Sequence, residues 1–199
     1  KLINFQNYSK KFLNNFFKKD NVEDFIPYGK HSISEEDTKE VLKVLRSNNI
    51  TQGQIVPKFE KAISEKVQSK YSIAVNSATS ALHLSCLALG VGEGDIVWTS
   101  PISFVASANC ALYCRAQIDF VDVDPSSGLI NIDSLEKKLF EAKKNNTLPK
   151  VLIPVHLAGS SCDMLRIYSL SKEFGFSIIE DASHAIGGHY NNYPVGSCK

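Results

Sequence analysis

The sequence lacks an excess of charge of either sign. Lysine and arginine total 22 against 21 aspartate and glutamate residues, so the net charge is +1 at neutral pH. Proteins that hold nucleic acid through its phosphates present a basic patch or stripe, which makes nucleic acid a poor candidate partner here. The chain also lacks a run of about 18 apolar residues, which a membrane-spanning helix needs. We therefore expect no nucleic-acid partner and no membrane span.

Cysteine occurs five times, an odd number without the spacing of a disulfide framework. The five residues are Cys86, Cys110, Cys114, Cys162 and Cys198. Scattered cysteines within apolar segments are typical of reduced, packed thiols in a cytosolic protein. Metal ligation is the weaker alternative, since the pair Cys110 and Cys114 has no second ligand pair at zinc-site spacing. The thiols thus predict a cytoplasmic location.

The first 24 residues differ from the rest of the chain. Aromatic residues recur there at spacings of three or four with lysines between them, which is the pattern of an amphipathic helix. These aromatic residues are Phe5, Tyr8, Phe12 and Phe16. A basic amphipathic helix can lie on a membrane surface, but we favour a helix that packs on the domain or on a dimer partner. We therefore expect an appended helix and linker over residues 1–24 and one domain over residues 25–199.

The remaining sequence alternates between short apolar runs and helical patterns. Ser34 stands before three acidic residues, as an N-cap does when negative charge lies near the positive end of a helix. A second helix is expected after Pro57. Strands are expected at residues 71–75, 96–98, 118–121, 151–155 and 176–179, and helices between them at 78–89, 103–115, 133–144 and 163–174. This alternation predicts an α/β fold with a mostly parallel sheet and helices on both faces.

Ligands of open α/β sheets bind beyond the carboxyl ends of the strands, so the segments after the expected strands are candidate sites. Small and hydroxyl-bearing residues, among them Ala78 and Thr79, open the helix after Val75. A helix N-terminus with small side chains can hold a phosphate, and a plain N-cap is the equal alternative. The segment lacks the glycine fingerprint of dinucleotide-binding folds, so a nicotinamide cofactor is not expected.

Two further strand ends carry residues suited to a flat, heteroaromatic ligand. Phe104 can cover a ring, although a core position is the commoner role for such a residue. Asp181 and His184 follow another strand, where a carboxylate beside a pyridine nitrogen would keep that nitrogen protonated. Taken singly, Asp181 as a cap and His184 as a structural histidine are the safer interpretations.

Taken together, these segments resemble the successive motifs of the pyridoxal-phosphate-dependent nucleotide-sugar aminotransferases of the DegT/StrS type. The matching segments are residues 26–29, 50–53, 76–82, 99–106, 122–125, 154–159 and 180–187. They follow one another in order from about residue 25 to the end of the chain. The resemblance implies the large domain of a fold-type-I pyridoxal-phosphate-dependent transferase, truncated before its small domain.

The resemblance also implies roles for individual residues toward pyridoxal 5′-phosphate. Ala78 and Thr79 match the turn that holds the cofactor phosphate. Phe104 matches the aromatic residue that stacks on the pyridine ring. Asp181 matches the carboxylate that pairs with the ring nitrogen, and His184 stands near the position of the ring hydroxyl.

Within the family, the motifs are most similar to those of transaminases of pseudaminic acid synthesis. This implies amination of a UDP-linked 4-keto-6-deoxy-N-acetylhexosamine with glutamate as the amino donor, by a homodimer. The residues that match sugar-nucleotide contacts are Tyr28, Asn48, Asn49, Ile50, Thr51 and Ala78.

The lysine that forms the Schiff base in the family matches no residue of this chain. Lys199 corresponds to a position ahead of it, so no catalytic residue is assigned and we expect the chain to be an inactive part of a longer protein. Two alternatives stay open. One is a sugar dehydratase of the same fold, in which histidine replaces the lysine. The other is a non-catalytic, truncated domain that binds nucleotide sugar or pairs with a complete subunit.

Overall fold

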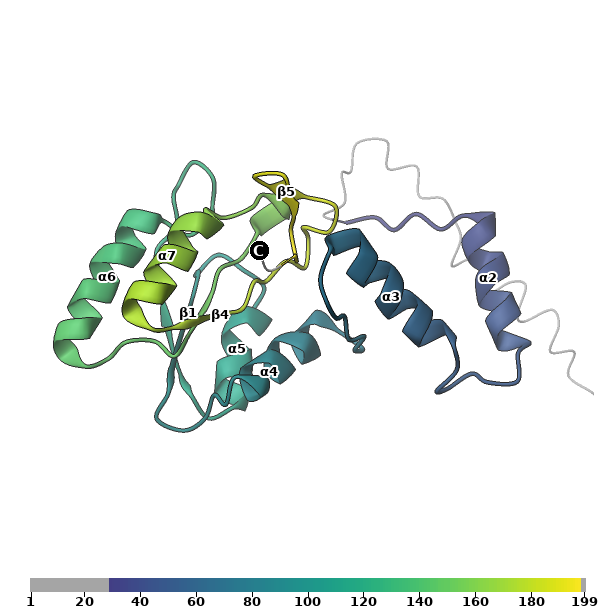
Figure 1. Cartoon of the computed structure of the whole chain (residues 1–199), viewed down its shortest axis with the longest axis horizontal. Coiled ribbons are helices and arrows are strands. Elements are labelled where there is room, and N and C mark those ends of the chain that lie inside the picture. Colours follow the sequence, from purple (N-terminus) through teal and green to yellow (C-terminus); the bar gives the residue numbers. More distant parts are fainter. Residues whose placement is uncertain (1–28, 198–199) are drawn as a thin grey trace, which may run out of the picture. The chain divides into compact units, whose positions relative to one another are not determined.

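The computed structural model describes residues 29–197. The chain divides into two compact units, residues 1–51 and residues 52–199 (Figure 1). The appended helix expected over residues 1–24 lies outside the described residues, as do Tyr28, Cys198 and Lys199. The domain boundary expected after residue 24 therefore stays a prediction.

The first unit contains one described helix, α2 (Glu35–Leu45), which begins as expected after Ser34. The Ser34 hydroxyl accepts the Asp37 N–H at 3.2 Å, and the Asp37 carboxylate accepts the Ser34 N–H at 2.8 Å. This reciprocal capping box satisfies N–H groups that have no partner within the helix. Hydrogen bonds from the backbone N–H and then the hydroxyl of Ser34 hold the pKa of the Asp37 carboxyl below its usual value.

The second unit is built on a four-stranded parallel sheet. Its strands are β1 (Ile96–Thr99), β2 (Gln117–Phe120), β3 (Val151–Ile153) and β4 (Ser177–Ile178), in the spatial order β2-β1-β3-β4. All three strand pairs are parallel. The predicted parallel sheet is therefore confirmed, with β1 and β3 at its centre.

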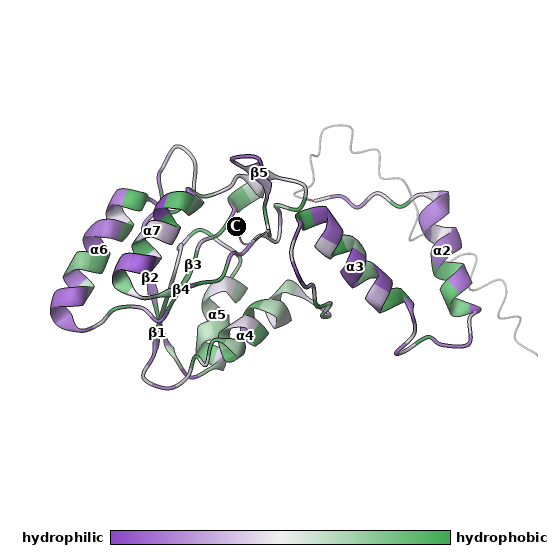
Figure 2. Ribbon diagram, in the orientation of Figure 1, coloured by the Kyte–Doolittle hydropathy of each residue, from purple (hydrophilic) through white to green (hydrophobic). Residues whose placement is uncertain are grey.

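Two pairs of helices cover the two faces of this sheet (Figure 1). The helices α4 (Ala78–Ala88) and α5 (Ala106–Tyr113) pack on one face, and α6 (Ile132–Asn145) and α7 (Met164–Phe174) pack on the other. Alternate strand residues divide between the two layers: Val97 joins the α4 and α5 side, whereas Trp98 joins the α6 and α7 side. Figure 2 shows α4 and α5 as largely apolar and α6 as banded with hydrophilic residues.

The expected strand at residues 71–75 is not formed. Tyr71 and Ile73 are 74% and 82% exposed, and the Ala74 N–H donates to Glu60 Oε1 at 2.8 Å rather than to a neighbouring strand. Glu60 lies on α3 (Ile55–Val67), the helix expected after Pro57. The alternating pattern is present, but a strand needs a partner for its N–H and C=O groups, and no described strand supplies one. This prediction was wrong for the described part of the chain.

A short hairpin near the end of the described residues was not predicted. The strands β5 (His189–Tyr190) and β6 (Tyr193–Pro194) pair antiparallel. Asn191 and Asn192 join them with φ angles of 47° and 66°. Asparagine tolerates this left-handed conformation better than most residues, which is why it suits a two-residue hairpin turn.

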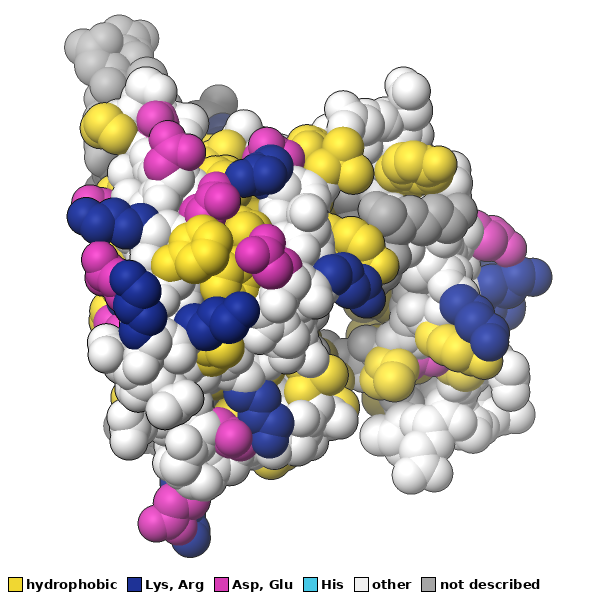
Figure 3. Space-filling view, turned by 60° about the vertical axis from the view of Figure 1, so that its left-hand side comes forward, with side chains coloured by type: hydrophobic (Ala, Val, Ile, Leu, Met, Phe, Trp, Pro, Cys, Tyr) yellow, Lys and Arg dark blue, Asp and Glu magenta, His cyan; other side chains and the backbone are white. Residues whose placement is uncertain are grey.

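The four described cysteines are buried and free, as expected for reduced thiols. No helix within residues 29–197 combines the length and apolar content that a membrane span needs. On the side of the second unit that carries α6, acidic and basic side chains are interspersed (Figure 3). This mixed surface agrees with the balanced charge of the sequence.

Candidate functional site

Asp181 lies just beyond the carboxyl end of β4, where the sequence places it. Its backbone N–H donates to the Pro154 carbonyl at 3.0 Å, and its carbonyl accepts the His156 N–H at 3.0 Å. These bonds extend the pairing of β3 and β4 through an isolated parallel bridge between Val155 and Asp181. The main chain of Asp181 is therefore held by two main-chain hydrogen bonds at the sheet edge where ligands of such folds bind.

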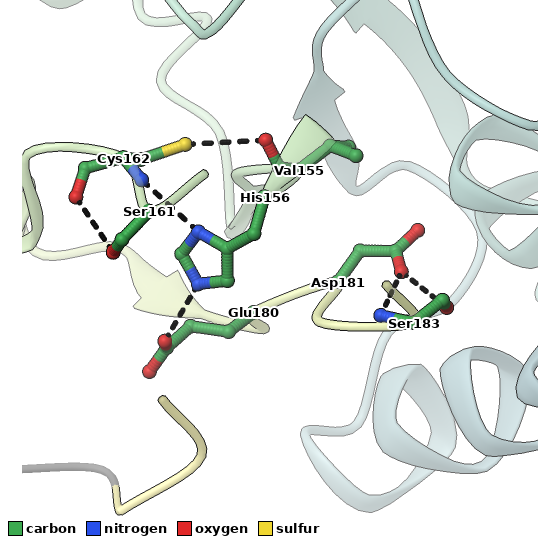
Figure 4. A network of polar contacts seen from close by, with 7 residues as sticks. All are labelled: Val155, His156, Ser161, Cys162, Glu180, Asp181 and Ser183. Atoms are coloured by element: carbon green, nitrogen blue, oxygen red, sulfur yellow. Dashed lines mark hydrogen bonds and ion pairs between the residues drawn. The ribbon is translucent and has the colours of Figure 1, made fainter. Parts of the chain in front are cut away.

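The Asp181 carboxylate is held by two serine hydroxyls. Ser107 Oγ donates to Oδ2 at 2.6 Å, and Ser183 Oγ donates to Oδ1 at 2.6 Å. The Ser183 N–H also donates to Oδ1 at 3.3 Å (Figure 4). Asp181 is 7% exposed and Ser107 is completely buried. A buried carboxylate that accepts hydroxyl protons on both oxygens is oriented to pair with a cation or a protonated ring nitrogen.

Phe104 is connected to the same group through the main chain. Phe104 lies just before α5, and its carbonyl accepts the N–H of Ser107, in the first turn of that helix, at 3.1 Å. The Phe104 side chain is 73% exposed, so the alternative that it is a core residue is wrong here. Ser107 thus joins two of the predicted site residues, Phe104 and Asp181.

His184 lies in the turn that follows Asp181. Its side chain is exposed, and the turn is closed by the Ala185 N–H, which donates to the Ala182 carbonyl at 2.9 Å. The turn approaches Gly159 closely, because a Cβ atom on Gly159 would lie 3.0 Å from the His184 carbonyl oxygen. Gly159 also has a φ of 87°, which disfavours any side chain there. The exposed ring gives no support to the alternative of a structural histidine.

Ala78 and Thr79 form the first turn of α4. The Ser77 hydroxyl caps this helix by accepting the Ser80 N–H at 3.2 Å, and Ser80 Oγ donates to Asn76 Oδ1 at 2.7 Å. The N–H groups of Ala78 and Thr79 precede the first intrahelical hydrogen bonds, and such groups favour an anion. The Ser77 cap therefore leaves the Ala78 and Thr79 N–H groups available for a phosphate, so the two interpretations of this segment are compatible. Within the described residues no hydrogen bond joins Thr79 to the Asp181 group, so their convergence stays a prediction.

The residues expected to contact the sugar nucleotide follow α2 in the first unit. Asn48, Asn49, Ile50 and Thr51 are all exposed. The Ser47 hydroxyl donates to the Asn49 carbonyl at 3.2 Å and helps to shape this segment. Their role toward a ligand stays a prediction, as does that of Tyr28.

A second polar group, centred on His156, was missed by the sequence reasoning. His156 is 1% exposed, and its Nδ1 accepts the Cys162 N–H at 3.1 Å. Because that nitrogen accepts, the ring proton lies on Nε2, which donates to Glu180 Oε2 at 2.9 Å (Figure 4). His156 and Glu180 belong to two of the matching segments and Cys162 to none, and no spacing in the sequence indicates that a ring would join the three.

Cys162 contributes a further bond to this group. Its Sγ donates to the Val155 carbonyl at 3.2 Å, and burial raises the pKa of the thiol to about 11. The thiol is therefore protonated at neutral pH and serves as a hydrogen-bond donor rather than a nucleophile.

The described residues suit pyridoxal phosphate on three counts. A buried carboxylate can accept from a pyridine N–H, a helix N-terminus can bind a phosphate, and an exposed aromatic ring can lie on a flat heterocycle.

Residues 29–197 bring no three potential metal-ligating side chains together. A surface hollow lined by Trp98, Lys138 and Asp119, among others, contains none of the predicted site residues. There Lys138 Nζ lies 2.8 Å from Asp119 Oδ2 and 4.9 Å from the centre of the Trp98 ring, so its charge is already engaged.

Comparison with known sequences agrees with this geometry. The profile of the DegT/DnrJ/EryC1/StrS aminotransferase family matches residues 31–199. The chain is 38% identical over 173 residues to the spore coat polysaccharide biosynthesis protein SpsC of Bacillus subtilis, covering 87% of this chain and 43% of that protein. It is also 38% identical over 172 residues to a UDP-4-amino-4,6-dideoxy-N-acetyl-beta-L-altrosamine transaminase of Campylobacter jejuni, covering 86% and 44% respectively. The chain thus spans less than half the length of these relatives.

Solved structures show the same relationship. PseC of Helicobacter pylori, an aminotransferase involved in the biosynthesis of pseudoaminic acid, superposes with a TM-score of 0.78 at 34% identity, covering 85% of this chain and 44% of that one. The sugar aminotransferase Spr1654 of Streptococcus pneumoniae, in its PMP form, superposes with a TM-score of 0.78 at 31% identity, covering 86% and 45%. The second unit therefore has the large-domain fold of pyridoxal-phosphate-dependent aminotransferases.

Proposed function

Because the chain belongs to the DegT/DnrJ/EryC1/StrS aminotransferase family, whose cofactor is pyridoxal 5′-phosphate, we propose that it is the cofactor-binding part of a nucleotide-sugar transaminase. The observation that carries this proposal is the buried Asp181 carboxylate, held by two hydroxyls at the carboxyl end of the sheet. The substrate that we propose is a UDP-linked 4-keto-6-deoxy-N-acetylhexosamine, with glutamate as amino donor. The names of the Campylobacter and Helicobacter relatives support the choice of sugar, and the amino donor is the one that the family resemblance implies.

Each predicted site residue has a task in this proposal. When bound, the cofactor supplies a pyridinium ring that withdraws electrons from the substrate carbon. Asp181 would keep the proton on the ring nitrogen, and the first turn of α4 would bind the phosphate. Phe104 would cover one face of the ring and exclude water from it, and His184 would contact the ring hydroxyl. The sugar nucleotide is assigned to Tyr28, Asn48, Asn49, Ile50, Thr51 and Ala78.

The substitution Asp181→Asn in the full-length protein tests the central assignment. We expect turnover to fall by about 10²–10³-fold, since a neutral amide cannot hold the proton on the ring nitrogen by charge. Asp163→Asn is the matched control, because Asp163 caps α7 by accepting the Arg166 N–H at 3.2 Å and asparagine caps equally well. Near-normal turnover of Asp181→Asn, with cofactor occupancy confirmed by absorbance, would contradict the proposal.

Product analysis separates the transaminase from the two alternatives. The full-length protein is incubated with the UDP-linked keto sugar, glutamate and pyridoxal phosphate, and the products are identified by mass spectrometry. A transaminase forms the amino sugar and 2-oxoglutarate in equal amounts. A deoxygenated sugar that has gained no amino group would indicate the dehydratase, and an unchanged sugar that stays bound would indicate a non-catalytic domain. We also propose a cytoplasmic location, which the buried, unbridged thiols of the described residues support.

A further inference from the structure

We propose that Ser107 is a positioning residue that sets the orientation of the Asp181 carboxylate toward the cofactor ring, with Ser103 as its supporting hydrogen-bond donor. This inference rests on the proposed function, because it concerns the same carboxylate. It adds Ser107, in the first turn of α5, and Ser103, in the segment just before that helix, and neither the motifs nor the family resemblance assigned a role to either residue.

The hydrogen bonds of this group have fixed directions. An ionised carboxylate only accepts, so the single Ser107 hydroxyl proton goes to Asp181 Oδ2 at 2.6 Å. Ser107 Oγ also lies 2.7 Å from Ser103 Oγ. Since the Ser107 proton is already used, Ser103 must donate in this contact. The order is therefore Ser103 to Ser107 to Asp181, and a hydroxyl that accepts a hydrogen bond donates more strongly.

The lone pairs of the carboxylate are nearly all engaged. The two oxygens offer about four lone-pair positions. Three of these positions are taken: by the Ser107 hydroxyl, the Ser183 hydroxyl and the Ser183 N–H. One position is left for a donor that comes from outside this group. The arrangement thus specifies a single direction from which a ring N–H can approach.

Ser107 is well placed to hold this direction. It is completely buried in the first turn of α5, next to Ala106, which is also buried against the sheet. Its N–H donates to the Phe104 carbonyl at 3.1 Å, so the same residue fixes the backbone of the aromatic residue and the carboxylate of Asp181. One serine therefore fixes the positions of both Phe104, which is proposed to cover the ring, and Asp181, which is proposed to pair with the ring nitrogen.

Removal of the Ser107 hydroxyl frees one lone-pair position and lets the carboxylate turn. We expect Ser107→Ala in the full-length protein to weaken pyridoxal phosphate binding by about tenfold, as expected when one hydrogen bond to a charged group is lost. The ¹⁵N resonance of the ring nitrogen in labelled pyridoxal phosphate should move in the same direction as in Asp181→Asn. Both readouts are independent of turnover.

Ser171→Ala is the matched control. Ser171 is also a buried serine in a helix, and its Oγ donates to the Tyr168 carbonyl at 2.7 Å. It lies on α7, which packs on the opposite face of the sheet from α5. This substitution removes a comparable hydroxyl and should change neither cofactor affinity nor the ¹⁵N resonance.

The outcomes distinguish this inference from the proposed function. If Asp181→Asn changes both readouts and Ser107→Ala changes neither, the positioning role is overturned and the proposed function stands. If Asp181→Asn also leaves both unchanged, the proposed function itself fails. Should Ser107→Ala not fold, Ser103→Ala decides, because it keeps the Ser107 hydroxyl but removes its donor. If Ser103→Ala weakens pyridoxal phosphate binding by less than the tenfold expected for Ser107→Ala, the inference is supported. If Ser103→Ala leaves pyridoxal phosphate binding unchanged, the inference is overturned.

Discussion

His156 illustrates how one buried ring can hold three segments of a chain together. Its main-chain N–H binds the segment after β4, Nδ1 binds the Cys162 N–H, and Nε2 binds Glu180. Both ring hydrogen bonds form only in the tautomer that carries its proton on Nε2, because Nδ1 must accept and Nε2 must donate. Glu180 precedes Asp181 directly, so the ring also stabilises the strand end that carries the proposed site.

We predict that His156→Ala destabilises the protein by about 2–4 kcal/mol, because it leaves the buried Cys162 N–H without its partner and opens a cavity. Urea unfolding of the full-length protein measures this change. His31→Ala is the control, since His31 is exposed, and it should stay within about 0.5 kcal/mol of the parent protein. A similarly small effect of His156→Ala would show that the ring holds nothing together.

Individual side chains divide into those that sequence reasoning could place and those that it could not. Asp181 was predictable because a strand ends before it, and an acid at a strand end is visible in the sequence. Ser107 was not, because its contact with Asp181 spans 74 residues. The spacing of Ser103 and Ser107, four residues apart in the helix expected over residues 103–115, was the available signal, since such a spacing brings two side chains together on a helix. In the structure α5 begins only at Ala106, and the two hydroxyls still lie 2.7 Å apart.

The strands of the central sheet are also linked at their amino ends. Asp95, just before β1, accepts from Lys150 Nζ at 2.8 Å, and Lys150 stands just before β3. Lys150 also donates to the Gly90 carbonyl at 2.6 Å. The hydrogen bond from Lys150, followed by that from the Gly92 N–H, lowers the pKa of the Asp95 carboxyl from its ordinary value of 3.8.

This lowered pKa makes a prediction about stability and pH. The contribution of the pair is fully present above pH 3.8, the unfolded value, and is lost as the pH falls through the lower folded value. Lys150→Met should therefore lower the free energy of unfolding at neutral pH, and the difference from the parent should shrink toward about pH 2. Lys61→Met, which removes an exposed partner of Glu65, should show little effect. A difference that does not change with pH would assign the loss to packing alone.

Secondary structure was most predictable where local chemistry decides it. The cap at Ser34 and the apolar β3 were read directly, because a capping box and a fully buried parallel strand leave clear patterns. Residues 71–75 have the pattern of a strand without a described partner, so a local signal could not decide their structure. The strand expected over 151–155 ends at Ile153, because Pro154 has no N–H to donate to a neighbouring strand.

The assembly of the full-length protein is the broadest remaining prediction. We propose a homodimer, as the family resemblance implies. Exposed apolar side chains on α2, namely Val41, Leu42 and Leu45, support this proposal, since dimer contacts cover such groups. Light scattering at micromolar concentration should give the mass of two chains. A full-length protein that is monomeric and active would refute the dimer and leave the cofactor assignments untouched.

The order of the strands determines how fast their backbone amide protons exchange with solvent. β1 and β3 are each flanked by two strands, whereas β2 and β4 have one described neighbour each. Deuterium should therefore enter the main chain of β2 first, by local fraying, and that of β3 only when the unit opens as a whole. Val151, Leu152 and Ile153 are all completely buried. The amide exchange rates of these three residues would thus report the global free energy of unfolding of the unit that contains Asp181.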